Sequence, residues 1–342
     1  MRVLVVGGGI AGVSIGYELA EGHEVTVLEA EKSLALHTTG RSAATWIGSY
    51  GPPGVRDFSA KSLAWLLDPP IPTDGPIATA MECLWVADED HTAGLRDLIE
   101  ATGIEELTPE EATKINPVLR PEAIALGALD REARDLDVSG LHHAYTRALR
   151  ARGGTVVTSA RVAEATRHGD TWRVTTTSGD VVEAEVVVDA AGAWGDEVAK
   201  AFGAQPIGLA PKRRTLFTSP THADLTHVPF TAGHDGSFYF KSEGDTVLCS
   251  PQEATDHEPG DPKPDELEIA RAIERINDLT TLGLRSVRSA WAGLRTFTPS
   301  GEPHVAWDPS IDGFFWFVGQ GGWGIQMAPA LAQFGAAQIR GI

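Results

Sequence analysis

Three glycines near the N-terminus have the spacing of a nucleotide-binding turn. Gly7, Gly9 and Gly12 follow a short apolar run and precede a helical pattern. The first glycine permits a tight turn, the second lets the backbone approach a pyrophosphate, and the third lets the helix pack closely on the strand. Glu29, at the end of the next predicted strand, can accept hydrogen bonds from a ribose diol. Because the strand, the helix and the acid agree, the motif predicts a bound dinucleotide rather than a plain glycine turn.

A second glycine-rich turn stands near the C-terminus. Residues 319–326 read Gly-Gln-Gly-Gly-Trp-Gly-Ile-Gln and lie between an apolar strand and the last predicted helix. A helix N-terminus stabilises negative charge, and a flavin gains negative charge at its N1–C2=O edge on reduction. A nicotinamide enzyme has no need of such a turn, and no second glycine fingerprint for NAD(P)H occurs in mid-chain. The two turns together favour FAD, the alternative being an ordinary turn before a helix.

Hydrophobic spacing predicts the elements that position these turns. The predicted strands include Arg2–Val6, Glu24–Leu28, Cys83–Ala87, Thr155–Thr158 and Phe314–Val318. The predicted helices are Ile10–Glu21, one capped by Thr108 with Glu111 three residues later, one capped by Ser139, Pro264–Leu279 and a last one from about Gly324. A hairpin is predicted between Trp172–Thr177 and Val181–Val188.

Length and composition narrow the class of protein. The 342 residues suggest about two domains, and 42% of them are hydrophobic, enough for a sizeable core. The formal net charge of −19 argues against a nucleic-acid partner, which needs clustered Lys and Arg. Two cysteines, Cys83 and Cys249, cannot form a disulfide scaffold or a Cys-rich zinc site, and we expect no metal. No signal-peptide pattern or membrane-spanning run is found, so we expect a cytoplasmic protein, with peripheral docking at the inner membrane face left open.

Several blocks along the chain resemble one known superfamily. The blocks are residues 7–12 with Glu29, Thr39-Gly40-Arg41-Ser42-Ala43-Ala44, Pro211-Lys212-Arg213-Arg214, Ser237-Phe238-Tyr239, Trp291-Ala292-Gly293-Leu294-Arg295 and Gln320–Gln326. The sequence resembles the FAD-dependent amine oxidoreductases of the D-amino acid oxidase, glycine oxidase and sarcosine oxidase superfamily. Within that superfamily it is most similar to the bacterial FAD-dependent D-arginine dehydrogenases, which act broadly on D-amino acids.

The resemblance implies an α/β fold with two domains. A Rossmann-like FAD-binding domain of the GR2 type would comprise residues 1–50, 135–208 and 289–342. A second α+β domain on a mixed sheet would comprise residues 51–134 and 209–288 and carry the substrate pocket. The substrate would lie between this second domain and the flavin.

The resemblance also implies roles for individual residues. Arg214 and Arg295 would bind a substrate carboxylate, with the hydroxyls of Tyr50 and Tyr239 around it. Gly322 and Gln326 would face substrate and flavin, and Arg41 and Ser42 would lie beside the FAD pyrophosphate and flavin. The remaining positions implied to contact FAD are Ile10, Ala11, Ala30, Ala43, Ala44, Val162, Ala191, Gly192, Gly293, Gly321, Trp323, Gly324 and Ile325.

Physical chemistry supports the arginine roles. An arginine fork binds a carboxylate through bidentate charge-assisted hydrogen bonds, which orient the ligand as well as holding it. Read without the resemblance, Arg295 in an apolar strand is equally well a structural ion pair. Arg214 has two basic neighbours, Lys212 and Arg213, and the sequence does not say which of the three faces inward.

Two departures from the D-arginine dehydrogenases bear on the substrate. Thr45 stands where those enzymes have an active-site histidine. Either Glu82 or Cys83 stands where they have a glutamate that pairs with the substrate guanidinium, and the two cannot face the same side of a strand. If Cys83 faces the pocket, a cationic side chain would be buried without a partner, so neutral or hydrophobic D-amino acids are favoured.

The resemblance implies oxidative deamination of a D-amino acid to a 2-oxo acid and ammonia, with hydride transfer from Cα to flavin N5. A dehydrogenase is favoured over an oxidase, with a quinone, an electron-transfer protein or O2 as acceptor. The chemistry needs no dedicated base, so His37, His142, His143 and His234 are interpreted as surface or structural residues. FAD is expected to be non-covalent, because no cysteine lies near Gly293-Leu294-Arg295. A glycine or sarcosine-type amine oxidase and a non-catalytic flavin-binding subunit are the alternatives.

Overall fold

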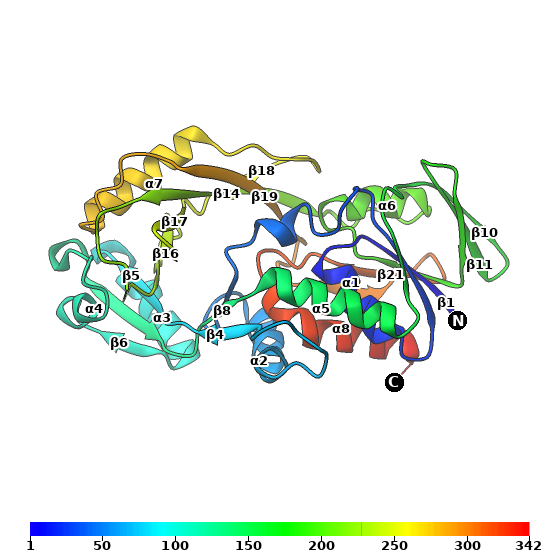
Figure 1. Cartoon of the computed structure of the whole chain (residues 1–342), viewed down its shortest axis with the longest axis horizontal. Coiled ribbons are helices and arrows are strands. Elements are labelled where there is room, and N and C mark those ends of the chain that lie inside the picture. The colour runs from blue at the N-terminus through cyan, green and yellow to red at the C-terminus, as the bar shows by residue number, and fades with distance from the viewer. Residues whose placement is uncertain (227, 342) are drawn as a thin grey trace.

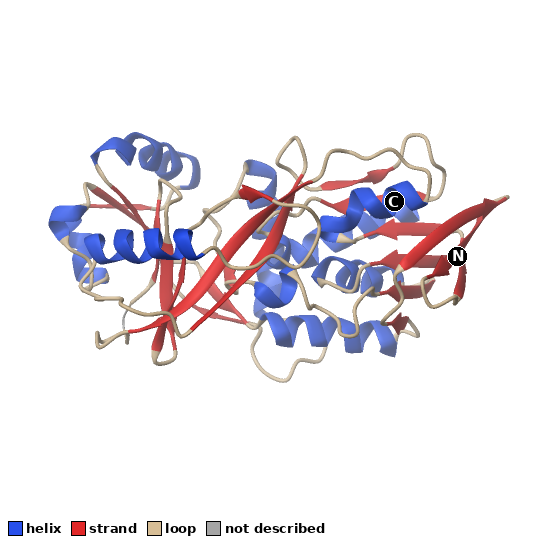
Figure 2. Ribbon diagram, turned by 90° about the horizontal axis from the view of Figure 1, so that it is seen from above, coloured by secondary structure: helices blue, strands red, loops and turns tan. Residues whose placement is uncertain are grey.

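Two large sheets lie along the long axis of the molecule, which is described for residues 1–226 and 228–341 in a computed structural model (Figure 1). The sheet that contains the N-terminal strand lies at one end with both chain termini, and the larger sheet lies at the other. Seen from above, helices surround the first sheet, and long strands of the second reach towards it (Figure 2). The expected α/β fold with two kinds of sheet is therefore confirmed.

The first sheet has six strands in the order β20-β21-β13-β1-β2-β9, all parallel except β20. Its strands are β1 (Arg2–Val6), β2 (Glu24–Leu28), β9 (Thr155–Val157), β13 (Val186–Asp189), β20 (His304–Trp307) and β21 (Phe314–Val318). The parallel strands are continuously apolar because both faces of the sheet are covered. The helices on one face are α1 (Ile10–Leu19), α5 (Val138–Ala151) and α8 (Gly324–Arg340).

The other face of the parallel sheet packs on a small antiparallel sheet and a short helix. These elements are β10 (Val162–His168), β11 (Thr171–Thr176), β12 (Val181–Ala184) and α6 (Gly195–Ala201). Successive side chains of β1 point to opposite faces of the sheet and so join different hydrophobic cores. Val3 and Val5 pack with the helices, whereas Leu4 belongs to the core that contains Trp172 and Phe202. This sandwich fixes the strand ends from which the glycine turns emerge.

The second sheet is mixed and runs β18-β14-β17-β16-β15-β5-β7-β6, with β19 paired to β14. Its strands are β5 (Cys83–Ala87), β6 (Glu105–Leu107), β7 (Leu126–Asp130), β14 (Ala210–Pro220), β15 (Phe230–Gly233), β16 (Tyr239–Glu243), β17 (Thr246–Ser250), β18 (Thr255–Asp256) and β19 (Ser289–Phe297). Helices α3 (Thr92–Thr102), α4 (Pro109–Ile115) and α7 (Glu266–Leu279) pack on it. The β15–β5 pair is parallel and the other pairs are antiparallel.

A small third unit connects the two large sheets. It comprises β3 (Thr45–Trp46), β4 (Ala78–Ala80), β8 (Arg134–Leu136) and helix α2 (Pro53–Leu67). β19, which the predicted boundary places in the FAD-binding domain, pairs along its length with β14 of the larger sheet. The predicted domain boundaries themselves stay a prediction.

Local signals predicted most elements correctly, and two of the predictions were wrong. The predicted strand Val181–Val188 is divided at Glu185, because β12 pairs with β11 while β13 pairs with β1. The α5 helix is capped by Asp137, whose Oδ1 accepts from Gly140 N at 2.7 Å, and not by Ser139, which lies inside the helix. The capping box predicted at Thr108 is confirmed.

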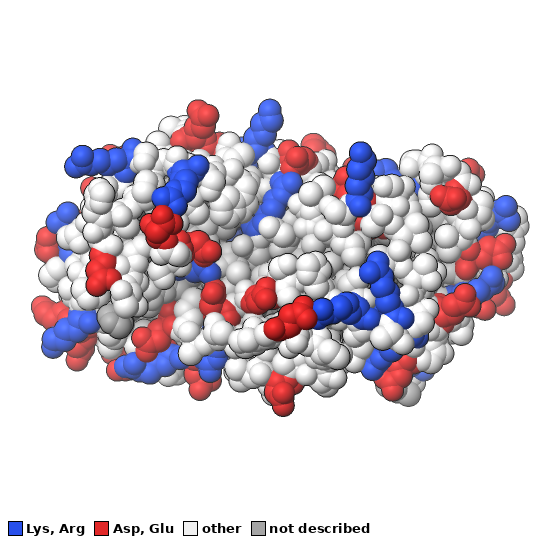
Figure 3. Space-filling view, viewed as in Figure 1, with Lys and Arg blue, Asp and Glu red and all other residues white. Residues whose placement is uncertain are grey.

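The surface carries charge of both signs. In Figure 3, Lys and Arg side chains are interspersed with Asp and Glu over the visible face. Within the described part of the chain, none of the helices is both long enough and apolar enough to cross a bilayer.

Asp189, the last residue of β13, is a fully buried acid. Its Oδ1 accepts from Ala191 N at 3.0 Å, and Oδ2 has no partner among the described residues. Burial raises the pKa of this carboxyl group to about 8. The protonated form is therefore stabilised by the fold, at the strand end that supports the first glycine turn.

We predict that Asp189→Asn changes the pH dependence of stability. An unfolded aspartate loses its proton near pH ~3.9, whereas native Asp189 keeps it until about pH 8, so the wild-type free energy of unfolding falls as pH rises through this window. The Tm of the variant relative to wild type should rise by about 5 °C between pH 4 and pH 8. Asp170→Asn, at an exposed position, is the control and should show no such trend. If the Tm of the wild type instead rises relative to that of the variant as pH increases, the raised pKa of Asp189 is contradicted.

Candidate active site

One cavity of about 470 Å³ runs between the two sheets and is lined by both glycine turns. Gly9 lines one part of it and Gly322 another, although 313 positions separate them in the chain. The walls come from β1, β2 and β21 on one side and from β14, β16 and β19 on the other. The cavity therefore joins the two motifs into one site.

The first turn requires glycine at two positions. Gly7 has φ +110°, and a Cβ there would lie 2.5 Å from Ala190 O. A Cβ on Gly12 would lie 1.8 Å from Gly7 O, so Gly12 lets helix α1 pack on the turn without itself lining the cavity. Both glycines thus have the roles expected of a nucleotide-binding turn.

Three side chains from other parts of the chain stabilise this turn. Thr39 Oγ1 accepts from Ile10 N at 3.0 Å at the start of α1, where Gly9 offers no side-chain cap. Glu29 accepts from Gly8 N and from Glu31 N, each at 2.8 Å, and its carboxylate has further lone pairs for a ribose. His142 Nε2 lies 2.9 Å from Gly8 O. The contacts of Thr39 and His142 could not be predicted from the sequence, because neither residue lies near Gly7–Gly12 in the chain.

The second turn brings Gly322 against Arg295. Gly321, with φ +54°, donates its N–H to Thr296 O at 2.9 Å and so joins the turn to β19. A Cβ on Gly322 would lie 2.8 Å from Arg295 Cδ, so a larger residue here would require the Arg295 side chain to move. Helix α8 begins at Gly324 without a side-chain cap, and its first residues line the cavity. Its free N–H groups are placed to meet negative charge.

Two arginines and two tyrosines gather at the end of the cavity beside this turn. Arg295 Nη1 donates to Tyr50 Oη at 3.2 Å, and Arg214 Nε donates to Glu253 O at 2.9 Å. Burial, followed by the charge of Arg295, lowers the pKa of Arg214 to about 10. Burial would raise the pKa of Tyr50, but Arg295 and Arg214 outweigh it and lower that pKa. Burial raises the pKa of Tyr239. This end of the cavity is strongly positive.

Of the three basic residues on β14, Arg214 lines the cavity. Lys212 Nζ lies 2.5 Å from Asp256, and Arg213 Nη2 lies 2.6 Å from Asp265. Arg213 points to the opposite face of the strand from Arg214, and the Lys212 pair lies outside the cavity lining. Arg214 is therefore the basic residue of positions 212–214 that faces the cavity.

One wall of the cavity is apolar. It is formed by Ile47, Trp85, Leu216, Phe230 and Ala232. The described carboxylates that line the cavity are Glu29, Glu31 and Glu197, which lie towards the first glycine turn. No described acid therefore faces the arginine end.

The structure also answers the question of Glu82 and Cys83. Glu82 points outward, and its carboxylate lies 2.9 Å from Arg131. Cys83 is fully buried beneath the apolar wall, where burial and then Asp130 raise the pKa of its thiol. Neither residue lines the cavity, so neither could pair with a cationic substrate side chain.

Tyr50 is placed by contacts to the larger sheet. Ser49 N donates to Asp130 Oδ2 at 3.1 Å, and Trp85 Nε1 donates to Ser49 Oγ at 3.1 Å. The Tyr50 ring packs on Trp85 and Trp323, with centroid distances of 6.1 and 5.8 Å. The segment that carries Tyr50 is therefore held to both sides of the cavity.

Most of the predicted site residues line this one cavity. Those that line it are Gly7, Gly9, Ile10, Ala11, Glu29, Ala30, Arg41, Ser42, Ala43, Tyr50, Val162, Ala191, Gly192, Arg214, Tyr239, Gly293, Arg295, Gly321, Gly322, Gly324, Ile325 and Gln326. Gly12, Ala44 and Trp323 do not line it. Their contact roles stay predictions, as do those of the lining residues.

Two predicted residues have their polar groups committed to protein. Gln326 accepts from Ile47 N at 3.2 Å and donates to Ser59 Oγ at 2.7 Å, so its amide fastens α8 to α2. Arg41 Nη1 donates to Ala292 O at 2.7 Å and lies 2.6 Å from exposed Asp261.

The histidines occupy varied positions. His142 is buried, and burial lowers its pKa. His143 is exposed, and His234 is half-buried outside the cavity. His37 lines the cavity next to Trp194 and lies 3.2 Å from Glu31.

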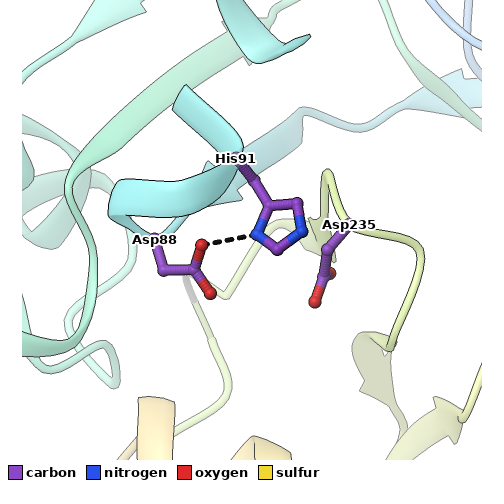
Figure 4. Close-up of side chains that lie close together, drawn as sticks. All are labelled: Asp88, His91 and Asp235. Carbon is purple, nitrogen blue, oxygen red and sulfur yellow. Dashed lines mark hydrogen bonds and ion pairs between the residues drawn. The ribbon is translucent and has the colours of Figure 1, made fainter. Parts of the chain in front are cut away.

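One cluster elsewhere resembles a metal site. Asp88, His91 and Asp235 have ligand atoms within 4.8 Å of one another, and His91 Nδ1 lies 2.5 Å from Asp88 (Figure 4). Arg275 Nη2 lies 2.9 Å from Asp88 and 3.7 Å from Asp235. The carboxylates thus already have a cation, and the group is an ion-pair network outside the cavity.

A parallel sheet with a glycine turn after its first strand, and a second glycine turn at a helix start on the same cavity, agree with a dinucleotide-dependent oxidoreductase. The family model described as FAD dependent oxidoreductase (DAO) matches residues 2–338. The chain belongs to this family, and FAD is its cofactor.

Curated relatives cover several amine oxidoreductases. Glycine oxidase of Bacillus licheniformis is 25% identical over 358 residues, which cover 99% of this chain and 92% of that protein. Mitochondrial dimethylglycine dehydrogenase of Rattus norvegicus is 27% identical over 74% of this chain, which spans only 31% of the rat protein. D-amino acid dehydrogenase 1 of Mesorhizobium japonicum is 42% identical over 69 residues, 20% of this chain and 16% of that protein.

Solved structures share the fold. L-α-glycerophosphate oxidase of Mycoplasma pneumoniae, which was solved with FAD bound, has a TM-score of 0.89 at 17% identity, over 99% of this chain and 94% of that one. L-proline dehydrogenase of P. horikoshii has a TM-score of 0.85 at 19% identity, over 99% and 92%. At such identities the likeness concerns the fold alone.

The residues present fit FAD. The first turn and Glu29 would hold its pyrophosphate and ribose, and the start of α8 would meet its ring. Gln320 Nε2, in the second turn, is buried without a partner among the described residues, which suits a ligand with acceptors.

We predict that FAD is released by denaturation. None of the described residues that line the cavity is a cysteine, and Cys249 lies in the core of the larger sheet. Acid precipitation of the holoprotein should therefore leave the flavin absorbance in the supernatant. Flavin that stays with the pellet would show a covalent link through another residue.

Gly322→Ala tests the contact between the second turn and Arg295. The new Cβ would displace Arg295, so we expect the KM for a carboxylate substrate to rise about tenfold or more. Gly75→Ala is the matched control, since a Cβ there meets nothing within 4 Å. Steady-state kinetics and flavin content measure both variants, and an unchanged KM for Gly322→Ala would refute the placement of Arg295.

Proposed function

We propose that this protein is a dehydrogenase that uses FAD to convert D-amino acids into 2-oxo acids and ammonia. The observation that carries the proposal is the pair Arg214 and Arg295, both lining one end of the cavity beside the start of α8. Two guanidinium groups with no facing acid form a carboxylate site. An amino acid bound there would present its Cα on the side of the FAD ring.

The chain contributes positioning rather than acid–base groups. Arg214 and Arg295 fix the carboxylate, Tyr50 and Tyr239 flank it, and the apolar wall excludes water. FAD, when bound, supplies the acceptor for a hydride. The substrate amine reacts in its free form, so that its lone pair forms the C=N bond as the Cα–H bond breaks. The imino acid product then takes up water and releases ammonia in solution.

The apolar wall favours neutral and hydrophobic side chains. Trp85, Phe230 and Ala232 line it, and Glu82 is turned away towards Arg131. A cationic side chain would lie near two arginines without an anion, which costs free energy. D-Leu, D-Met and D-Phe are therefore expected to be better substrates than D-Arg.

A second candidate is a glycine or sarcosine-type amine oxidase. It is favoured by the likeness to glycine oxidase, which extends over 99% of this chain, whereas the likeness to the D-amino acid dehydrogenase covers 20%. Its substrates would use the same arginines and leave the apolar wall unfilled. The electron acceptor in either case is proposed to be a quinone, an electron-transfer protein or O2.

The test is an anaerobic titration of the holoprotein with paired enantiomers. D-Leu and D-Phe should bleach the oxidised flavin spectrum, whereas L-Leu and L-Phe should not. Glycine and sarcosine are included, and a faster bleaching by either would favour the second candidate. A flavin that none of these amines reduces would indicate a non-catalytic flavin-binding protein.

The side-chain preference is measured in the same panel. With a dye acceptor, kcat/KM for D-Leu, D-Met and D-Phe should exceed that for D-Arg and D-Lys by about tenfold or more, equivalent to ~1.4 kcal/mol. A preference for D-Arg would contradict the outward orientation of Glu82.

The rate of flavin reduction by a D-amino acid should also rise with pH, because the free amine of the substrate accumulates.

A further inference from the structure

The strand that carries Arg214 is paired irregularly at this residue. β17 and β18 are successive partners of β14, with Phe217 opposite Cys249 and Arg213 opposite Thr255. Between these two pairs β14 advances by four residues and its partner by six. The two extra residues form a bulge at positions 251–254, which we call the 251–254 bulge. Bulges beside active sites redirect side chains.

The backbone of the bulge is held in an uncommon conformation. Gln252 has φ +56°, which residues other than glycine rarely adopt. Its N–H donates to Ser250 Oγ at 3.1 Å, and its side-chain Nε2 donates to Phe238 O at 2.5 Å. Ser250 Oγ in turn donates to Thr215 O at 2.8 Å. These bonds tie the bulge to the strands on either side of it.

Glu253 contacts the arginine strand in two ways. Its side chain is 5% exposed, and Oε1 accepts from Thr215 N at 2.7 Å. Its main-chain O accepts from Arg214 Nε at 2.9 Å. Among the described residues this is the one hydrogen bond of the Arg214 guanidinium, so both Nη atoms remain for a ligand.

We propose that Glu253 is a positioning residue for Arg214. The carboxylate anchors the 251–254 bulge on Thr215, and the carbonyl of the same residue then fixes the guanidinium through Nε. The two Nη atoms are left facing the cavity in one orientation. The inference rests on the proposed function, since it takes Arg214 as a group that binds the substrate carboxylate.

Glu253 also lies close to a second arginine of β14. Its Oε1 lies 3.6 Å from Arg213 Nε, and Arg213 and Arg214 are adjacent on β14. Burial raises the pKa of the Glu253 carboxyl group, and Arg214 and Arg213 oppose this shift. Oε2 has no partner among the described residues, so the hydrogen bond from Thr215 N to Oε1 sets the side chain in place.

The experiment measures carboxylate binding to the holoprotein with benzoate, read by the change in flavin absorbance. Glu253→Ala should raise the benzoate Kd about tenfold, and Glu253→Gln, which keeps an acceptor for Thr215 N, should restore it to within about threefold. Glu253→Asp, one methylene shorter, should behave like alanine and serves if the alanine variant fails to fold. Asp265→Asn is the matched control, because Asp265 pairs with Arg213 on the far side of the strand.

A double-mutant cycle separates positioning of Arg214 from a general structural role. In an Arg214→Ala background, Glu253→Ala should add less than about twofold to the Kd, because its effect acts through Arg214. A full tenfold effect in that background, or no effect in wild type, would overturn the inference. If Arg214→Ala alone leaves benzoate binding unchanged, the carboxylate site of the proposed function fails instead. Benzamide, which lacks the charge, should be insensitive to Glu253→Ala.

Discussion

Two guanidinium groups placed out of water beside each other form the constraint on which the rest of this structure depends. Arg214 is buried and Arg295 half-buried, and no described acid faces the end of the cavity that they line. Such charges are costly unless hydrogen bonds and an anion satisfy them. The protein supplies part of this, through Tyr50 Oη for Arg295 and Glu253 O for Arg214, and leaves the remainder to a ligand. A carboxylate is the group whose shape and charge complete the set.

A second constraint is the set of backbone N–H groups at the starts of two helices, α1 and α8, which both line the cavity. At α1 the glycine turn leaves no side-chain cap, and Thr39, in the short 3-10 helix Thr38–Arg41, accepts a hydrogen bond from Ile10 N instead. At α8 no side chain caps the helix, and its first turn opens onto the cavity. The cavity thus presents hydrogen-bond donors of the backbone at both turns, with the arginines beside the second. A long anionic cofactor with a polar ring matches this order, in agreement with the family to which the chain belongs.

How much could be predicted from the sequence differed between the elements and the site. Strands such as Arg2–Val6 and Phe314–Val318 agree with the structure at both ends, because a buried parallel strand is a continuous apolar run between turns. The predicted strand Val181–Val188 was wrong because its two halves pair with different sheets, which no local pattern records. The orientation of Glu82 depended on the pairing of β5 and on a partner, Arg131, that is 49 positions away.

By itself, the sequence determined the glycine turns, the strands that carry them and the set of side chains available for chemistry, since turn geometry and apolar spacing are local properties. Only the tertiary structure decided which of three neighbouring basic residues faces the cavity, and it also showed that the amide of Gln326 is used to join two helices. The tertiary structure also revealed that Thr39 and His142 contact the first glycine turn and that Glu253 contacts the strand of Arg214. These outcomes depend on contacts between residues far apart in the chain, whose geometry is set by how the sheets pack and not by the spacing of neighbours.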